Sequence, residues 1–253
     1  MGFNLQVLSK PNVKNHILII GLPGIGNVGK IALDFLVESL KAKKFATITS
    51  DSFPNSVFVN EKNLIDLPEV ALYHTKSKGK DYFFLGGDAQ PVDEKSCFEF
   101  CNFILDTIKS YGCNGVVTIG GIALQKIPKL PKVYITGTDK EFIKQFNGAL
   151  SNIYGVVGPI MGVSGIMLGI SKLKKIPSAC LLAQTFGHPA YIGVKGSREV
   201  LKVINSRFKF SLEISRLSEE IEELEEDLHM RAKKLTAEMP AGKSKNPEVS
   251  YFG

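Results

Sequence analysis

Long apolar segments are absent from this chain of 253 residues. No charged start followed by an apolar run opens the sequence, so no secretory signal peptide is predicted. No uninterrupted apolar stretch approaches the roughly 20 residues that span a bilayer. The longest weakly polar stretch, residues 153–170, contains five glycines and one proline, and we expect buried strand and turn there. The sequence therefore predicts a cytoplasmic protein without a membrane partner.

Cysteine is scarce, and the C-x-x-C spacing is missing. The chain has only Cys97, Cys101, Cys113 and Cys180. The first two lie four residues apart on a predicted helix, where two thiolates could hold one metal ion. Apolar residues share that helical face, however, and no third or fourth ligand of a tetrahedral zinc site lies nearby. We therefore expect these thiols in the hydrophobic core, and no metal site.

Pairs of acid and base residues that would mark a catalytic site are also missing. His16, His74 and His188 each stand alone in their segments, and a lone histidine is usually structural. Residues 162–165 come near the G-x-S-x-G pattern of serine hydrolases, but the spacing fails. The sequence predicts no catalytic residue and no cofactor, and hence not an enzyme.

Charge is distributed unevenly along the chain, whose net charge is +6. Acidic residues crowd between positions 213 and 227, which leaves the remainder correspondingly basic. The lysines are scattered, and no RNA-recognition sequence with interleaved aromatic residues is present. No nucleic-acid partner is predicted.

Residues 17–34, ILIIGLPGIGNVGKIALD, combine an apolar run, a glycine-rich turn and a helical pattern. The β-branched run Ile17–Ile20 predicts a buried strand. A strand, a glycine turn and a helix in this order can aim backbone N–H groups and the positive end of a helix dipole at an anion. The candidate anion-binding loop consists of Gly24, Gly26, Gly29 and Lys30.

This glycine loop almost matches two nucleotide-binding motifs. Gly24, Gly26 and Gly29 fit G-x-G-x-x-G, but the acidic residue that would contact a ribose, Asp51, comes late. In the P-loop pattern, Ile31 stands where Mg²⁺ binding needs a Ser or Thr hydroxyl. The favoured interpretation is a tight turn that lets helix and strand pack closely, and a bound phosphate or nucleotide is the alternative.

Apolar runs alternate with helical periods through most of the chain. This alternation predicts an α/β fold with a mostly parallel, mixed sheet flanked by helices. The expected helices cover residues 93–111, 139–146 and about 198–205, and residues 70–75 and 81–85 are expected to form a hairpin. Strands ending at Gly86-Gly87, Gly120-Gly121 and Gly137 place small residues where α/β sheets bind ligands. The expected strands are Ile17–Ile20, Phe45–Ser50, Val70–Thr75, Tyr82–Leu85, Val116–Ile119, Val133–Thr136 and Ala179–Gln184.

The pattern changes after residue 205 to apolar residues in alternating steps of four and three. Such a heptad seam predicts a long acidic helix over residues 206–236 that follows an α/β domain over residues 1–205. The helix is expected to pack on its own domain or on a neighbouring subunit, and the two alternatives remain open. The seam residues are Phe210, Ile214, Leu217, Ile221, Leu224 and Leu228.

Residues 237–253 form a short polar tail that ends in Tyr251, Phe252 and Gly253. Two aromatic side chains at the tip of a flexible tail gain little unless something covers them. Such an end can act as a peptide ligand whose aromatic anchor fills a pocket while the terminal carboxylate meets a lysine or backbone N–H groups. The alternative is a tail that folds back on its own domain.

The glycine loop LPGIGNVGKIA, the later GGIAL and the acidic late helix together resemble the PAC2 family, particularly archaeal homologues of proteasome assembly chaperones. The resemblance spans roughly residues 10–235. It implies a fold similar to purine nucleoside phosphorylase, homo-oligomers, and no catalytic activity.

The resemblance also gives the tail a partner. Proteasome-binding chaperones and activators commonly end in a hydrophobic residue, a tyrosine and any residue, which dock between 20S α subunits. Here Tyr251 takes the hydrophobic position, Phe252 the tyrosine position, and Gly253 supplies the carboxylate. The expected function is proteasome assembly or binding. The alternative is a phosphate- or nucleotide-binding α/β enzyme that uses the loop from Gly24 to Lys30.

Overall fold

A computed structural model describes residues 2–155 and 158–215. Its elements follow the chain in an α/β order, with a small second sheet inserted near the N-terminus. The strands are β1 (Phe3–Val7), β2 (His16–Gly21), β3 (Lys43–Ser50), β4 (Phe58–Val59), β5 (Ile65–Asp66), β6 (Val70–Ser77), β7 (Lys80–Gly87), β8 (Cys113–Leu124), β9 (Val133–Gly137) and β10 (Ser178–Phe186). The helices are the short 3₁₀ turn η1 (Ile25–Asn27), α1 (Val28–Ser39), α2 (Glu94–Lys109), α3 (Lys140–Ile143), α4 (Gly162–Leu173) and α5 (Val194–Phe208).

The main sheet has eight strands in the order β1-β3-β6-β7-β2-β8-β10-β9. The central strands β7, β2, β8 and β10 pair in parallel, while β1, β6 and β9 pair antiparallel with their neighbours. The predicted α/β fold with a mixed sheet flanked by helices is confirmed. All seven predicted strands form, and the sequence analysis missed β1, β4 and β5.

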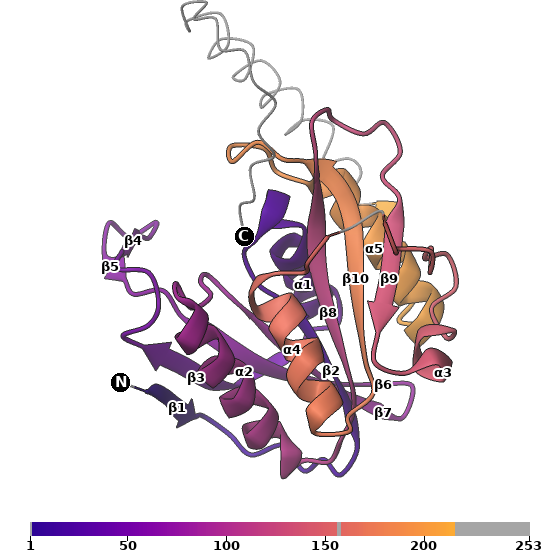
Figure 1. The fold of residues 1–253 in the computed structure, drawn as a ribbon. Coiled ribbons are helices and arrows are strands. Elements are labelled where there is room, and N and C mark those ends of the chain that lie inside the picture. The colour runs from indigo at the N-terminus through magenta and orange to yellow at the C-terminus, as the bar shows by residue number, and fades with distance from the viewer. Residues whose placement is uncertain (1, 156–157, 216–253) are drawn as a thin grey trace, which may run out of the picture.

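Helices cover both faces of this sheet (Figure 1). Alternate residues of β2 point to opposite faces, as the pleat requires. Ile19 packs in the core that α1 and α5 cover, whereas Leu18 and Ile20 pack in the core under α2 and α4. Each face of the sheet thus has its own apolar core, with the buried strands shared between them.

The predicted hairpin between residues 70 and 87 is confirmed, and its turn is tight. Strands β6 and β7 are joined by Lys78 and Gly79 alone, which have φ angles of 48° and 77°. Two consecutive positive φ values are the mark of a type I′ turn, whose twist matches that of the strands.

Helix α2 confirms the prediction for residues 93–111. The Asp93 side chain accepts a hydrogen bond from the backbone N–H of Ser96 and so caps the helix. Gly112, with φ of 70°, follows the last turn. The predicted core position of Cys97 and Cys101 on this helix is confirmed, because both side chains are buried in the core under α2 and α4.

The expectation of strand and turn for residues 153–170 is wrong, because α4 begins at Gly162. Its buried residues Val163, Met167 and Ile170 recur at helical spacing and pack toward α2. Two of the five glycines that argued against a helix, Gly162 and Gly165, make close contacts. A Cβ on Gly165 would lie 1.8 Å from the Ile160 carbonyl oxygen.

The other two helices differ from their predicted bounds. α3 ends at Ile143, three residues short, and α5 is longer than expected at both ends. No helix in the described ranges combines the length and the apolar character needed to cross a bilayer.

Phe210, the first residue of the predicted heptad seam, does not lie on a helix. α5 ends at Phe208, and both Lys209 and Ser211 have positive φ, which interrupts any helix through this point. The Phe210 ring packs 4.7 Å from the Tyr82 ring and 5.4 Å from the Phe208 ring, measured between centroids. It is therefore part of the α/β core.

Ile214 also packs against the core under α1 and α5, but it is only partly buried. The remaining seam residues Leu217, Ile221, Leu224 and Leu228 lie outside the described residues, as do Tyr251, Phe252 and Gly253. The prediction of one helix over residues 206–236 is therefore wrong, because residues 206–208 belong to α5, which ends there. Its part beyond residue 215 and the tail stay predictions.

We predict that Phe210→Ala lowers the free energy of unfolding by about 3–5 kcal/mol, because it empties a site among buried rings. Urea unfolding measures the change. Leu173→Ala, at a position that is 83% exposed, serves as the control and should be neutral. A neutral result for Phe210→Ala would remove this residue from the core.

Candidate functional site

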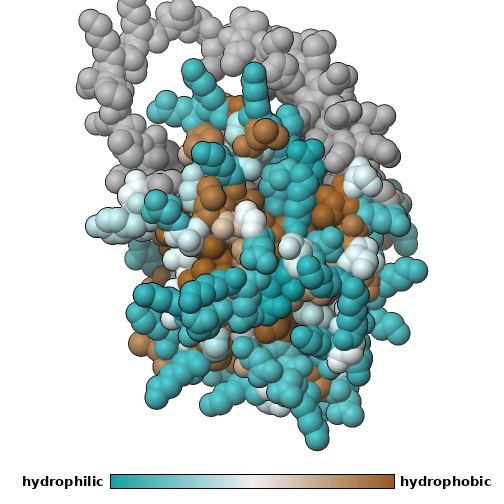
Figure 2. Space-filling model, turned by 90° about the vertical axis from the view of Figure 1, so that its right-hand side faces the viewer, coloured by the Kyte–Doolittle hydropathy of each residue, from teal (hydrophilic) through white to brown (hydrophobic). Residues whose placement is uncertain are grey.

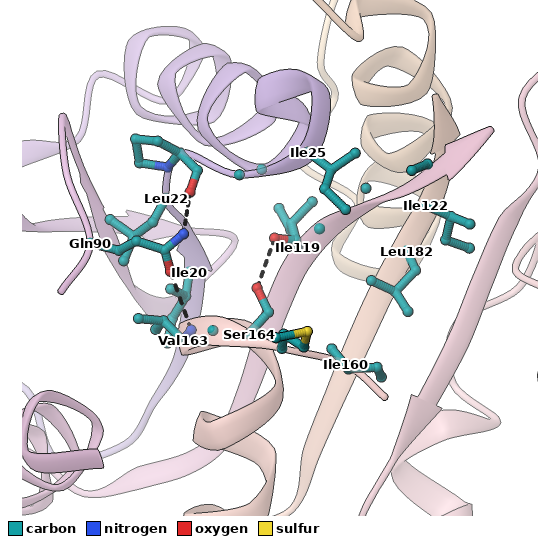
Figure 3. A pocket seen from close by; sticks show the side chains of 18 of the residues that line it. Ile20, Leu22, Ile25, Gln90, Ile119, Ile122, Ile160, Val163, Ser164 and Leu182 are labelled. Atoms are coloured by element: carbon teal, nitrogen blue, oxygen red, sulfur yellow. Dashed lines mark hydrogen bonds between the residues drawn. The ribbon is translucent and has the colours of Figure 1, made fainter. Parts of the chain in front are cut away.

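A cavity of about 340 Å³ lies at the end of the sheet that the carboxyl ends of β2, β8 and β10 form (Figure 3). Its walls include the glycine loop before α1 and the start of α4, two helices that lie on opposite faces of the sheet. In open α/β sheets, ligands bind at such a point, outside the carboxyl ends of the strands. The cavity is therefore the first candidate for a site.

The wall of this cavity is mainly apolar, with isoleucines from three segments facing one another (Figure 3). Among the described residues of this wall, Gln90 and Ser164 alone bring polar side chains, and none is charged. The apolar lining consists of Ile20, Leu22, Pro23, Ile25, Ile119, Ile122, Ala123, Pro159, Ile160, Met161, Val163 and Leu182. Such a wall suits an apolar group better than a phosphate.

Gln90 joins two sides of the cavity. Its Nε2 donates a hydrogen bond of 2.7 Å to the Pro23 carbonyl oxygen in the glycine loop. Its Oε1 accepts one of 3.3 Å from the backbone N–H of Val163, in the first turn of α4. The amide therefore holds the glycine loop and α4 at a fixed separation (Figure 3).

Ser164 is likewise engaged with the protein itself. Its hydroxyl donates to the Ile119 carbonyl oxygen at 3.3 Å, and the Thr118 hydroxyl donates to the Ser164 carbonyl oxygen at 3.2 Å. Both polar side chains of the wall thus stabilise the wall. Sequence reasoning missed Gln90, which no motif surrounds. It considered Ser164 only as part of the failed G-x-S-x-G pattern, because α4 was not expected.

The structure separates the four residues of the predicted anion-binding loop. Gly24 and Gly29 line the cavity, whereas Gly26 and Lys30 are not among the lining residues. Gly26 has a φ of 60°, and a Cβ there would lie 2.7 Å from the Thr185 hydroxyl oxygen. Gly26 is therefore required by the turn and its neighbours.

Close packing of α1 on the sheet accounts for Gly21 and Gly29. A Cβ on Gly21 would lie 2.1 Å from the Gly29 carbonyl oxygen, and a Cβ on Gly29 would lie 2.6 Å from the Ile119 carbonyl oxygen. Both approaches are to backbone atoms, which cannot swing aside. The glycines let helix and strands touch, as the favoured interpretation of the loop requires.

Lys30 is occupied by acidic neighbours. Its Nζ lies 3.2 Å from Asp34 and 3.3 Å from Asp88, and it donates to the Gly87 carbonyl oxygen at 3.3 Å. Burial alone would lower the pKa of Lys30, but the two carboxylates more than offset it and raise the pKa. Burial also raises the pKa of Asp34, and the nearby Lys30 offsets this rise only in part. Because both side chains are partly exposed, their ion pair contributes little to the stability of the fold.

The dinucleotide-binding arrangement is not assembled. Asp51 follows β3, and β6 and β7 lie between β3 and β2 in the sheet. A ribose-binding acid would need the strand next to the glycine turn. Among the glycines expected at strand ends, Gly120 and Gly121 line the cavity, while Gly86, Gly87 and Gly137 do not.

Clusters of titratable residues do not form a second site within residues 2–155 and 158–215. No group of three or more His, Cys, Asp or Glu side chains there could hold a metal ion. His74 pairs with Asp81, at 2.9 Å between Nε2 and Oδ1, and His188 stacks on Phe186. His16 and His74 both contact the Phe83 ring, at 4.0 and 5.6 Å between centroids.

His16 lies at the opposite end of the sheet, where β2 begins, and lines a second cavity of about 520 Å³. Lys14, Lys80 and Arg207 also line this cavity. On the face of the protein shown in Figure 2, hydrophilic residues cover most of the lower half. The His16 ring stacks on Phe83 at 4.0 Å between centroids. Burial lowers the pKa of His16 to about 4, against a hydrogen bond from its ring to the Tyr111 carbonyl oxygen that raises it.

Taken together, the fold and the cavity define an α/β protein whose glycine turn packs a helix on the sheet. The cavity walls that the structure describes are mainly apolar and include no pair of acid and base residues. Comparison with known proteins agrees with the resemblance noted in the sequence. The chain belongs to the PAC2 family, whose profile matches residues 18–230.

Relatives of similar length are found in archaea. The uncharacterized protein MJ1210 of Methanocaldococcus jannaschii is 29% identical over 247 residues, which cover 95% of this chain and 93% of that one. PbaB from Pyrococcus furiosus, an archaeal proteasome activator, is 28% identical in sequence to this chain, and its crystal structure superposes on this structure with a TM-score of 0.84. That match covers 91% of this chain and 99% of PbaB.

PbaA from Pyrococcus furiosus, an archaeal homologue of proteasome-assembly chaperone, shares the fold. Its TM-score is 0.74 at 22% identity, and the match covers 92% of this chain and 93% of PbaA.

We predict that Gly29→Ala lowers the free energy of unfolding by about 1–3 kcal/mol or more, because the added methyl meets the Ile119 carbonyl oxygen. Gly24→Ala is the matched control in the same loop, since a Cβ there meets nothing within 4 Å. Thermal or urea unfolding of both variants measures the difference. Equal stability of the two would disprove the packing role of Gly29.

We also predict that stability falls with acid through His16. Its pKa in the folded protein, about 4, is lower than the ordinary 6.5, so folding disfavours the protonated ring. The stabilisation is complete above pH 6.5 and is lost as the pH falls toward 4, by up to about 3 kcal/mol. Unfolding by urea from pH 7 to 4.5 measures this loss.

His16→Gln serves as the control for this titration, since its amide can still donate a hydrogen bond but does not titrate. Its unfolding free energy should depend less on pH over the same range. Parallel pH curves for the two proteins would assign the acid sensitivity to other groups.

Proposed function

We propose that this protein is a non-catalytic proteasome-binding protein of the assembly-chaperone or activator type. In this proposal it docks its C-terminal residues into pockets between 20S α subunits. The observation that carries the proposal is the similarity to the proteasome activator PbaB, which extends over nearly the whole of both chains. The fold shared with PbaA supports it.

The chemistry of the chain end gives the proposal its mechanism. Tyr251 and Phe252 offer two aromatic anchors, and Gly253 offers the terminal carboxylate. Phe252 lacks the hydroxyl that a tyrosine would bring, which costs about 1–3 kcal/mol wherever the pocket leaves a buried partner unpaired. A single tail therefore binds weakly.

Several tails on one homo-oligomer would overcome this weakness. Once one tail is bound, the others act at a high effective concentration, and avidity can exceed single-tail affinity by roughly 10²–10⁴. The α/β domain then serves as the body that sets the spacing of the tails. This role needs no catalytic residues, in keeping with a cavity whose Gln90 and Ser164 both bond to backbone groups.

Removal of Tyr251, Phe252 and Gly253 is predicted to abolish binding to purified archaeal 20S particles and to free α subunits. The body should keep its melting temperature, because the two apolar cores of the described chain are built from residues 3–214, distant in sequence from these three. A pull-down with the full chain and with the chain ending at Ser250 tests this. Binding retained by the shortened chain would refute the tail mechanism.

Phe252→Tyr is the matched gain-of-function variant. It restores the hydroxyl and should strengthen 20S binding by up to about tenfold, the equivalent of 1.4 kcal/mol. Phe252→Ala should weaken binding. Preference of the full chain for free α subunits over assembled particles would indicate an assembly role, and the reverse an activator role.

A second candidate function is a phosphate- or nucleotide-binding enzyme that uses the loop from Gly24 to Lys30. The cavity beside two helix N-termini favours it, whereas the pairing of Lys30 with Asp34 and Asp88 opposes it. Thermal shifts with nucleotides and sugar phosphates, lost in Lys30→Ala, would support this function. Unchanged melting across such ligands would leave the proteasome proposal alone.

A further inference from the structure

The most unusual surface of the described chain is an apolar hairpin, residues 55–67, which we name the arm. It contains β4 and β5 and stands away from the body of the protein (Figure 1). Every residue of the arm is exposed except the half-buried Asn60. Its large apolar side chains are Val57, Phe58, Val59, Leu64, Ile65 and Leu67, which are 47–71% exposed. Apolar surface gathered in this way marks an interaction site.

Hydrogen bonds give the arm a defined shape. Asn60 Oδ1 accepts from the backbone N–H groups of Lys62 and Leu64, both at 3.0 Å, and Asn60 Nδ2 donates to Asp66 at 2.9 Å. Asn63 takes the left-handed conformation in the turn, with φ of 58°. The polar side chains thus fix the turn, and the apolar ones are left on the outside.

The base of the arm is anchored in the core. Phe53, which is buried, lies 5.9 Å from the Phe3 ring and 6.1 Å from the Phe100 ring. Val70 on the other side is fully buried at the start of β6. An isolated two-stranded hairpin is marginally stable in water, so an arm held at its base but uncovered along its length is suited to being covered by a partner.

More exposed apolar surface adjoins the base of the arm. The backbone N–H of Val92 donates to the Ser52 carbonyl oxygen at 3.1 Å, which places Val92 beside the base. Val92 is 66% exposed, and Phe98, in the second turn of α2, is 50% exposed. We name Val92 and Phe98 the receiving patch.

We propose that the arm of one copy of this chain docks on the receiving patch of a second copy, and that the second copy's arm docks back. The size of the arm favours a second copy over an unrelated partner. A stable interface uses about 20–30 residues a side, and the 13 residues of the arm are about half of that. A reciprocal exchange around a two-fold axis supplies the other half from the same sequence.

The charge of the arm is compatible with self-association. Although the whole chain carries +6, the arm holds only Glu61, Lys62 and Asp66, and Asp66 is already bonded to Asn60. Two identical arms can therefore approach each other's copy without strong repulsion between like charges. This inference concerns self-association alone and stands independently of the proposed proteasome binding.

Replacement of an arm side chain by a charge tests the inference. In the full-length protein, Ile65→Asp should shift the midpoint of self-association to about tenfold higher concentration or more, as loss of a central apolar contact does. Size-exclusion chromatography with light scattering measures the mass at protein concentrations from about 1 to about 100 μM. The matched control is Leu173→Asp, which also replaces an exposed branched aliphatic side chain by a carboxylate and should leave the mass unchanged.

Three outcomes would overturn the inference. The unaltered chain could remain a single copy at every concentration. Ile65→Asp could assemble like the unaltered chain, while Leu224→Asp in the predicted heptad seam dissociates it, which would assign self-association to that segment. Alternatively, Ile65→Asp could keep the oligomer and lose binding to 20S particles, which would make the arm a proteasome contact.

Cysteine crosslinking tests the reciprocal geometry directly. One preparation carries Val59→Cys and a tag, and another carries Phe98→Cys and a different tag. When they are mixed under mild oxidation, disulfides should join differently tagged chains. A mixture in which Leu173→Cys replaces Phe98→Cys should stay uncrosslinked. Equal crosslinking in both mixtures, or in neither, would disprove the docking of the arm on the receiving patch.

Discussion

The close contact between the backbones of α1 and the central strands is the constraint on which the rest of the structure depends. Gly21 and Gly29 face each other with no room for a side chain, and Gly29 also touches the Ile119 carbonyl oxygen. This contact fixes where the glycine loop passes over the ends of β2 and β8. The position of that loop in turn fixes one wall of the cavity, and Gln90 links the loop to the opposite wall.

A tightly packed loop has different chemistry from a phosphate-binding loop of the same sequence pattern. In the latter, the glycines clear space for a ligand and a lysine reaches it. Here the glycines clear space for the protein's own backbone, and Lys30 reaches Asp34 and Asp88. The same spacing of glycines therefore occurs in a phosphate-binding loop and in a loop that packs a helix on a sheet. The neighbours of the lysine distinguish the two kinds of loop.

Much of the fold could be predicted from the sequence, because the central strands are short apolar runs. Those of β2 and β8 are rich in β-branched residues, that of β7 is aromatic, and that of β10 contains two leucines. Helix α2 was equally readable, since Asp93 and Gly112 mark its ends. Helix α4 could not be predicted, because its three glycines lower the helix propensity. The close contacts of Gly162 with Gln90 and of Gly165 with Ile160 become visible only in the folded chain. Strand β1 was missed because it is a partly exposed edge strand without a long apolar run.

The cavity could be predicted only in part. Gly120 and Gly121 were predicted to follow a strand; they lie within β8 but line the cavity, and so they indicated the correct end of the sheet. Gln90 and Ser164 could not be found, since their roles arise from hydrogen bonds between segments about 70 and 45 residues apart in the chain. Of the two acidic partners of Lys30, Asp34 lies four residues further along α1, whereas Asp88, which follows β7, was hidden for the same reason.

The placement of Phe210 has a consequence for how this sequence can change over evolutionary time. Phe210 packs with Tyr82 and Phe208 near the start of β7, at the opposite edge of the sheet from the cavity. The chain leading to the C-terminus therefore departs from an anchor that shares no residue with the cavity wall. Substitutions that reshape the cavity therefore leave this anchor intact, and substitutions in the anchor leave the cavity wall intact. The two ends of one sheet are thus free to accumulate changes under separate selection.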